Sequence, residues 1–113
     1  MHELSLSAAI ADTVRDHAAD RGVTQVMVRI GHLRQVVPDS LQLCWGMVTQ
    51  GTDLDGAELV IDHVPAVVSC AGCGADTAID RPVLVCGACG SRDVVLVSGE
   101  EFLVVSIDVL EPV

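Results

Sequence analysis

Apolar residues recur at helical spacing from residue 4 to about residue 20. Leu6, Ile10, Val14 and His17 fall on one face of that segment. An apolar stripe at this spacing is typical of a helix that packs on a core. The spacing therefore predicts an amphipathic first helix. His17 is expected to be a partly buried residue with a satisfied hydrogen bond.

A strand and a second helix are predicted next. Residues 24–30 alternate between apolar and polar side chains, which is typical of a half-buried strand. Pro38 followed by Asp and Ser is a favourable helix start, and an apolar stripe that contains Cys44 and Trp45 follows it. We interpret Cys44 as a core-filling side chain, because a buried free cysteine behaves as a small hydrophobe.

Three further segments are rich in β-branched residues and predict strands at 57–64, 94–97 and 101–110. The last is the strongest, with alternate apolar residues expected on one face, namely Leu103, Val105, Ile107 and Val109. We expect the strands at 57–64 and 101–110 to be antiparallel neighbours. The pattern predicts an α/β (α+β) fold, in which a small three-stranded sheet carries two helices.

The segment 69–93 differs in composition from the rest of the chain. It holds four of the five cysteines and four glycines, and it lacks a helical pattern. Because the strand predicted at 101–110 follows this segment, we interpret the segment as a module inserted into the other domain. We predict an α/β domain formed by residues 1–66 and 98–113, and a ribbon module formed by residues 67–97.

Two C-x-x-C pairs in this module predict a metal site. Cys70 and Cys73 form one pair, Cys86 and Cys89 form the other, and glycine follows each pair. Two such turns that face each other offer four thiolates in a tetrahedron, which is the closed arrangement of structural zinc. Disulfides or free thiols are one alternative, and a single iron ion is another. Zinc is favoured over iron because the module contains no aromatic side chain.

The net charge argues against nucleic-acid binding, and the short apolar stretches argue against a membrane span. The formal net charge is −10 and all six basic residues are arginine, so the chain lacks the basic surface that nucleic-acid binding requires. No stretch reaches the roughly 18 apolar residues that cross a bilayer. The start lacks the pattern of a signal peptide, and paired cysteines are typical of metal sites in a reducing compartment. We expect a cytoplasmic protein that binds neither nucleic acid nor membrane.

The first residues offer a second set of metal donors. The Met1 amine, the His2 backbone nitrogen and His2 Nδ1 close two chelate rings around one ion. Glu3 can add a fourth donor through its carboxylate or its amide. Such a planar, nitrogen-rich set suits Ni(II) or Cu(II) better than Zn(II). On these residues alone, a solvated leader sequence remains the alternative.

Taken together, four motifs resemble the HypA/HybF family of nickel metallochaperones. They are the initial MHE, GTDLDGAELVI, the paired C-x-x-C turns and the closing GEEFLVVSIDV. The resemblance extends from Met1 to about Val109. It implies that the chain delivers Ni(2+) as cargo during maturation of [NiFe]-hydrogenase, and in some organisms of urease. It further implies nickel binding by Met1, His2 and Glu3, and structural Zn(2+) at the four motif cysteines.

The resemblance also implies partners. These are a HypB-type GTPase and the [NiFe]-hydrogenase large subunit, with the chain itself a monomer or a homodimer. No constellation of residues predicts an enzyme, and the sequence has no Walker-type phosphate-binding loop, so any nucleotide-driven step must come from a partner. Two rival functions remain: a zinc-ribbon interaction module without nickel function, and a small iron electron carrier. His63 is interpreted as structural, and His32 is given no role.

Overall fold

The computed structural model describes residues 2–110, which form two compact units. The first comprises the residues up to Arg29, Val36–Asp62 and the residues from Leu103 onward. The second comprises Ile30–Gln35 and His63–Phe102. The second unit therefore begins before residue 67 and ends after residue 97, and it takes up a short segment from the first half of the chain. The assignment of nickel to one domain and zinc to the other stays a prediction.

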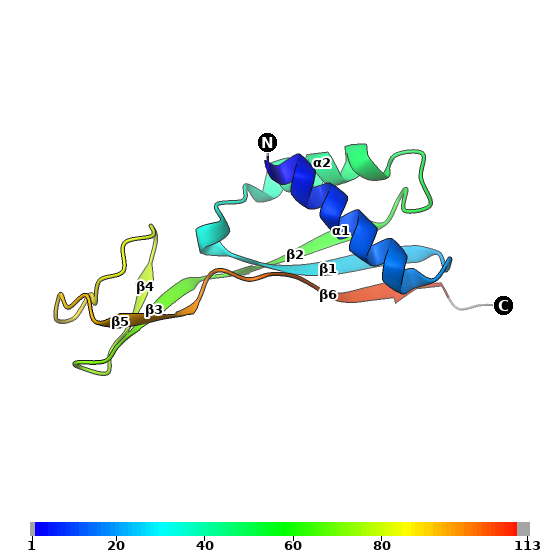
Figure 1. Ribbon diagram of the computed structural model, residues 1–113. Helices are drawn as coiled ribbons and strands as arrows, with labels where there is room; N and C mark the ends of the chain where they lie inside the picture. The colour runs from blue at the N-terminus through cyan, green and yellow to red at the C-terminus, as the bar shows by residue number, and fades with distance from the viewer. Residues whose placement is uncertain (1, 111–113) are drawn as a thin grey trace. The chain divides into compact units, whose positions relative to one another are not determined.

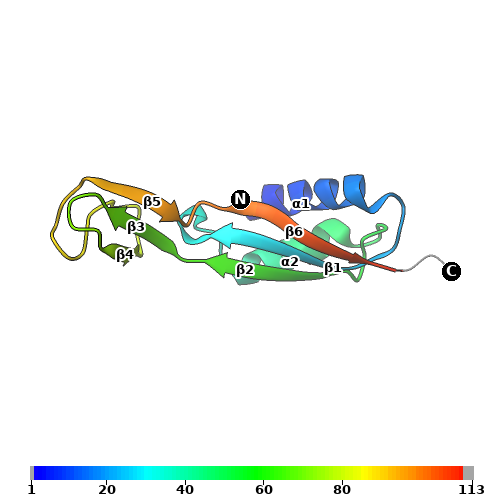
Figure 2. The same ribbon diagram turned by 90° about the horizontal axis from the view of Figure 1, so that it is seen from below.

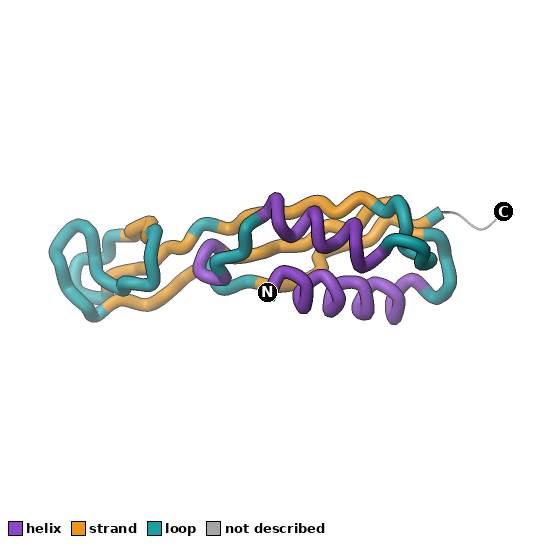
Figure 3. Tube along the Cα trace, turned by 90° about the horizontal axis from the view of Figure 1, so that it is seen from above, coloured by secondary structure: helices purple, strands orange, loops and turns teal. Residues whose placement is uncertain are grey.

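Two helices and a three-stranded sheet make up most of the first unit. Helices α1 (His2–Ala18) and α2 (Pro38–Thr49) lie side by side on one face of the sheet (Figures 1 and 3). The strands lie in the order β2-β1-β6, as Figure 2 shows from the opposite face. Their bounds are Val23–Gly31 for β1, Glu58–Val64 for β2 and Phe102–Val109 for β6. The predicted fold class, two helices on a small sheet, is confirmed.

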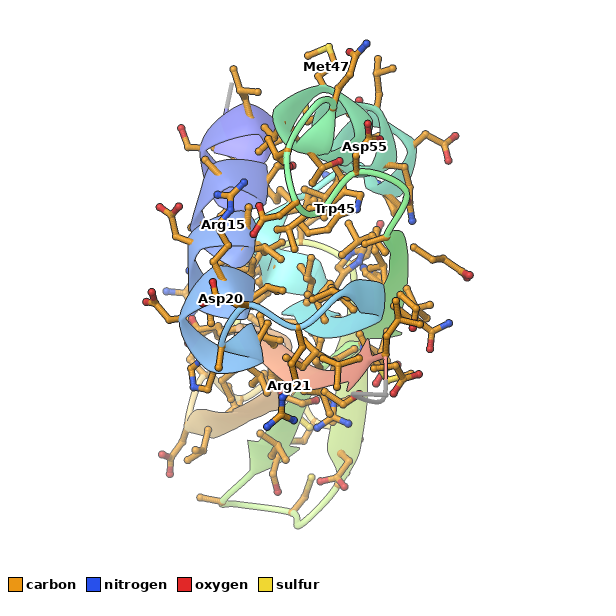
Figure 4. The ribbon with its side chains drawn as sticks, turned by 90° about the vertical axis from the view of Figure 1, so that its right-hand side faces the viewer. Arg15, Asp20, Arg21, Trp45, Met47 and Asp55 are labelled. Carbon is orange, nitrogen blue, oxygen red and sulfur yellow. The ribbon has the colours of Figure 1, made fainter. Side chains whose placement is uncertain are left out.

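The apolar pattern explains how the helices pack. Helix α1 buries residues at intervals of three or four, namely Ser7, Ile10, Ala11, Val14 and Ala18. On α2, Trp45 points inward and its Nε1 donates a 2.9 Å hydrogen bond to the Ala57 carbonyl, whereas Met47 points outward (Figure 4). Cys44 is half-buried. His17 is exposed, contrary to the prediction of partial burial, although its Nδ1 does donate to the Thr13 carbonyl over 2.9 Å.

The predicted pairing of the strands at 57–64 and 101–110 is wrong. Strand β1 lies between β2 and β6 and pairs with both. Val26 and Val28 of β1 are fully buried, which agrees with the central position of this strand in the sheet. The Leu110 amide donates to the Gly22 carbonyl over 2.7 Å, which fixes the end of β6 beside the start of β1.

The predicted face of β6 is also only partly correct. Leu103 and Val105 are 45% and 40% exposed, whereas Phe102 and Val104 are half-buried. Farther along, Ile107 is half-buried, so the alternation changes phase within the strand. Four consecutive apolar residues at the start of β6 do not specify which face is covered. For this reason the sequence pattern predicted burial of Leu103 and Val105 instead of Phe102 and Val104.

The second unit contains an antiparallel sheet in the order β4-β3-β5. The strands span Ala66–Cys70 for β3, Asp76–Ile79 for β4 and Val94–Ser98 for β5, and a 3-10 helix η1 spans His32–Arg34. Of these elements the sequence predicted only β5. Gly99 has φ +118°, and a Cβ there would lie 2.6 Å from the Ala66 Cα atom, so glycine is required at this close approach. Within residues 2–110, no helix has the length and apolar character needed to cross a membrane.

Candidate metal sites

The two cysteine pairs lie at the same end of the β4-β3-β5 sheet. Cys70 is the last residue of β3, and it lies opposite Val94, the first residue of β5. The turn that follows β3 and the turn that precedes β5 are therefore side by side, as Figure 1 shows. Pairing of the two strands brings together cysteines that are well separated in the sequence.

The two turns have the same backbone conformation. The Gly74 amide donates to the Cys70 carbonyl, and the Gly90 amide donates to the Cys86 carbonyl, each over 2.9 Å. Both glycines have φ +75°. This left-handed conformation costs an ordinary residue free energy, which explains a glycine directly after each cysteine pair. The C-x-x-C-G pattern thus encodes a repeated turn.

The distances between the sulfurs fit one tetrahedral ion. The Sγ atoms of Cys70 and Cys89 are 3.7 Å apart, and those of Cys73 and Cys86 are 3.6 Å apart. All four sulfurs lie within 4.8 Å of one another. Four sulfurs at about 2.3 Å from a zinc ion in a tetrahedron are roughly 3.8 Å apart, whereas a disulfide requires about 2.05 Å. The cysteines are unpaired, and their arrangement matches the metal site rather than the disulfides.

Backbone amides make one of the four sulfurs a thiolate at neutral pH. The amides of Cys89 and Ala88 hydrogen-bond to the Cys86 sulfur and lower the pKa of Cys86 to about 6. The Ala75 amide acts in the same direction on Cys73. Hydrogen bonds from the Cys73 thiol to the sulfurs of Cys86 and Cys70 outweigh it, so they raise the pKa of Cys73 to about 12. One of the four sulfurs is therefore negatively charged before a metal ion binds.

Each turn contributes one buried and one exposed cysteine. Cys70 and Cys86 are buried, whereas Cys73 and Cys89 are exposed. Thr77 of β4 supports the second turn, because its Oγ1 accepts a 2.9 Å hydrogen bond from the Gly87 amide. Sequence reasoning missed this support. A threonine ten residues before the turn gives no signal until β4 is placed beside it.

The structure describes two of the three predicted nickel residues. His2 and Glu3 begin helix α1, and Met1 lies outside the described residues. His2 Nε2 lies 3.2 Å from Glu3 Oε2, with side chains that are 55% and 16% exposed. The carboxylate sits in the first turn of the helix, where the helix dipole favours a negative charge. The two side chains are thus already paired, and His2 Nδ1 takes no part in that pair.

Comparison with known proteins shows the family of this chain. The family model described as "Hydrogenase/urease nickel incorporation, metallochaperone, hypA" matches residues 1–109. The class of protein is therefore a nickel-incorporating metallochaperone. A hydrogenase maturation factor HypA of a Nostoc species is 36% identical over 111 residues, which cover 98% of this chain and 97% of the relative. The HypA of Geotalea uraniireducens is 38% identical over 109 residues, with coverage of 96% and 99%. The chain belongs to the HypA family.

A solved structure has the same fold. The solution structure of the Ni metallochaperone HypA from Helicobacter pylori aligns with a TM-score of 0.66, over 97% of this chain and 98% of that one. The sequence identity is 18%, so this likeness supports the fold alone. The predicted family is confirmed, and with it a role in nickel incorporation during hydrogenase or urease maturation.

Proposed function

We propose that this chain binds Ni(II) through Met1, His2 and Glu3 and delivers it during maturation of [NiFe]-hydrogenase. A structural zinc ion at Cys70, Cys73, Cys86 and Cys89 would hold the second unit together. Membership of the family supports the general role. The observation that carries the residue-level proposal is the contact between His2 and Glu3.

That contact selects the ring nitrogen that is free for nickel. When Glu3 accepts a hydrogen bond from His2 Nε2, the proton sits on Nε2 and the lone pair sits on Nδ1. Nδ1 is the atom that closes a six-membered chelate ring with the His2 backbone nitrogen. A carboxylate that holds the second nitrogen of a metal-binding imidazole fixes both its tautomer and its orientation. Glu3 therefore supports the site even where it donates no ligand atom.

The start of the helix makes the backbone nitrogens accessible as well. Helix α1 begins at His2, and the first four amides of a helix have no acceptor within the helix. A nickel ion that displaces the proton of the His2 or Glu3 amide therefore breaks no helical hydrogen bond. With the Met1 amine this gives a compact, nitrogen-rich set that suits Ni(II).

The four-cysteine site suits a resident ion rather than cargo. Its sulfur separations fit zinc, and four protein ligands leave no open position. The second unit has a small apolar core, so binding of the ion contributes directly to its folding free energy. The terminal site differs in kind, because a recipient can remove its donors one at a time. A HypB-type GTPase and the hydrogenase large subunit are the partners proposed for that transfer.

The competing function is an interaction module in which the zinc ribbon presents a surface and the N-terminus is incidental. Calorimetric Ni(II) titration of the zinc-loaded chain separates the two functions. His2→Ala should abolish the tight nickel step and leave zinc content unchanged. His17→Ala is the matched control, because it removes an exposed imidazole from the same helix and should keep nickel binding. Equal nickel affinity in His2→Ala and the parent would refute the chaperone site.

A further inference from the structure

A further group of side chains able to bind a metal lies within the second unit, and it shares no residue with either site described above. His32 of η1, His63 of β2 and Asp80, which follows β4, line one open pocket of about 290 Å³. All three residues belong to the same compact unit. Apolar residues form the rest of its wall, namely Pro65, Ala66, Ala78 and Ile79. The pocket therefore has polar donors on an otherwise apolar lining.

Backbone hydrogen bonds hold these side chains in place. The Leu33 amide donates to the Gly99 carbonyl over 2.8 Å, which anchors the short helix that carries His32. Ala66 pairs with Ile79 across β3 and β4, so Asp80 is brought opposite the residue that precedes Ala66. The three side chains thus converge from separate elements by virtue of the fold.

His32 and Asp80 are already in direct contact. The Nε2 atom of His32 lies 3.2 Å from Asp80 Oδ1 and 2.9 Å from the Asp80 carbonyl oxygen. The imidazole N–H donates a hydrogen bond to the carboxylate and to the carbonyl. Two donor atoms that share a tetrahedral ion at about 2.0–2.1 Å are themselves roughly 3.3 Å apart. An ion that replaces the shared proton therefore needs little movement of this pair.

The separation of the two imidazoles also fits a shared ion. The ring centres of His32 and His63 are 5.3 Å apart, with an angle of 77° between the ring planes. Two imidazoles that bind one tetrahedral ion at about 2.0–2.1 Å place their ring centres roughly 5 Å apart. The edge-on arrangement does not yet aim both nitrogens at one point. Among residues 2–110, the four cysteines are the group whose ligand atoms already lie close enough together to hold an ion.

Rotation of one imidazole ring would aim the ring nitrogens of His32 and His63 at a common point. The second torsion of a histidine side chain is broad, so the exposed His63 ring can turn in place at small cost. We propose that His32, His63 and Asp80 form a second site for a divalent transition ion of the zinc or cobalt type. Imidazole and carboxylate are ligands that such ions accept, and the open pocket leaves room for water as a fourth ligand. This site is independent of the N-terminal nickel proposal.

The test uses a background that lacks the N-terminal site. A His2→Ala chain that already holds one ion at its cysteines is dialysed against Zn²⁺, and the bound metal is counted. One further ion per chain is expected. His63→Gln and Asp80→Asn should each weaken that additional binding by at least about tenfold. His17→Gln is the matched control and should leave it unchanged.

A second measurement guards against misfolding of the variants. Co²⁺ added to the His2→Ala chain should broaden the imidazole proton resonances of His32 and His63 and spare that of His17. Two outcomes would overturn the proposal. One is a parent chain that takes up no ion beyond the cysteine site, in which case the His32–Asp80 contact is a simple hydrogen bond. The other is His63→Gln binding the additional ion as tightly as the parent.

Discussion

The His2 imidazole and the Glu3 carboxylate lie 3.2 Å apart at the first turn of helix α1. Neighbouring residues in the sequence are thereby joined through their side chains, with the carboxylate on the Nε2 side of the ring. A proton on Nε2, facing the carboxylate, would leave the Nδ1 lone pair free for the proposed nickel chelate.

The first prediction concerns Glu3. Glu3→Ala removes both the hydrogen-bond acceptor and a donor oxygen, so nickel affinity should fall about 10–100-fold. Glu3→Gln keeps one acceptor oxygen in the same place and should lose less. Asp12→Asn is the control, since Asp12 is 79% exposed on the same helix and its loss changes the charge equally. Parent-like nickel affinity in Glu3→Ala would show that Glu3 neither orients His2 nor binds the ion.

The second prediction concerns the structural ion. Cys73→Ser should release zinc and leave residues 67–97 open to proteolysis, because little apolar surface holds that segment together. The helices and the β2-β1-β6 sheet should persist, which circular dichroism can follow. Cys44→Ser is the matched control, because Cys44 lies on α2 outside the sulfur cluster. One zinc retained by Cys73→Ser, with full protease resistance, contradicts the proposal.

The third prediction follows from the pKa values of the cysteines. Cys86 has a pKa of about 6, so it is a thiolate above that pH, whereas the pKa of Cys73 is raised to about 12. The Ser91 amide lowers the pKa of Cys89, but hydrogen bonds with the sulfurs of Cys70 and Cys86 outweigh it and raise that pKa. Zinc that binds at pH 7.5 must therefore displace at least the protons of Cys73 and Cys89. At pH 5 it must displace the Cys86 proton too, so zinc affinity should rise with pH.

Calorimetry in buffers of different ionisation enthalpy counts those protons directly. Proton release should be larger at pH 5 than at pH 7.5 by about one proton per ion, the one that Cys86 loses. A binding enthalpy that is the same in every buffer would mean that the thiols are already ionised or are not the ligands.

The sequence predicted the elements whose chemistry is local. The periods of the apolar residues identified α1, α2 and β1, and the glycines after each cysteine pair indicated the turns whose φ values are +75°. Strands β3 and β4 were missed because they are short and adjoin the cysteines. The pairing of β2 with β1 was missed for a different reason. Which strand is central depends on how all three strands pair, and this is set by the whole fold.

The same distinction applies to the sites. Cysteines at fixed spacing predict a tetrahedron from local geometry, and the sulfur positions agree with it. His32, His63 and Asp80 gave no signal in the sequence, because three separate elements bring them to one pocket. Donors that are distant in the sequence become recognisable only once the strands are in register.

The fourth prediction is a pH dependence of nickel binding. The ion must displace protons from an amine, from a backbone amide and from an imidazole, and ordinary imidazoles hold their proton below about pH 6.5. These effects have the same sign, so nickel affinity should be clearly lower at pH 6.0 than at pH 7.5. Paired calorimetric titrations, with zinc content checked after each, measure the difference. Equal affinity at the two pH values would remove the amine and imidazole from the donor set.

In the proposed site the free amine of Met1 and His2 hold the nickel together, so one residue added in front of Met1 should destroy the site. The added residue turns the donor amine into an amide and leaves every side chain in place. The measurement is a calorimetric Ni(II) titration of the zinc-loaded chain with and without that residue, and the same residue added after Val113 is the control. The tight nickel step should be lost in the N-terminally extended chain only, with zinc content and fold unchanged. Undiminished nickel affinity in that chain would contradict it.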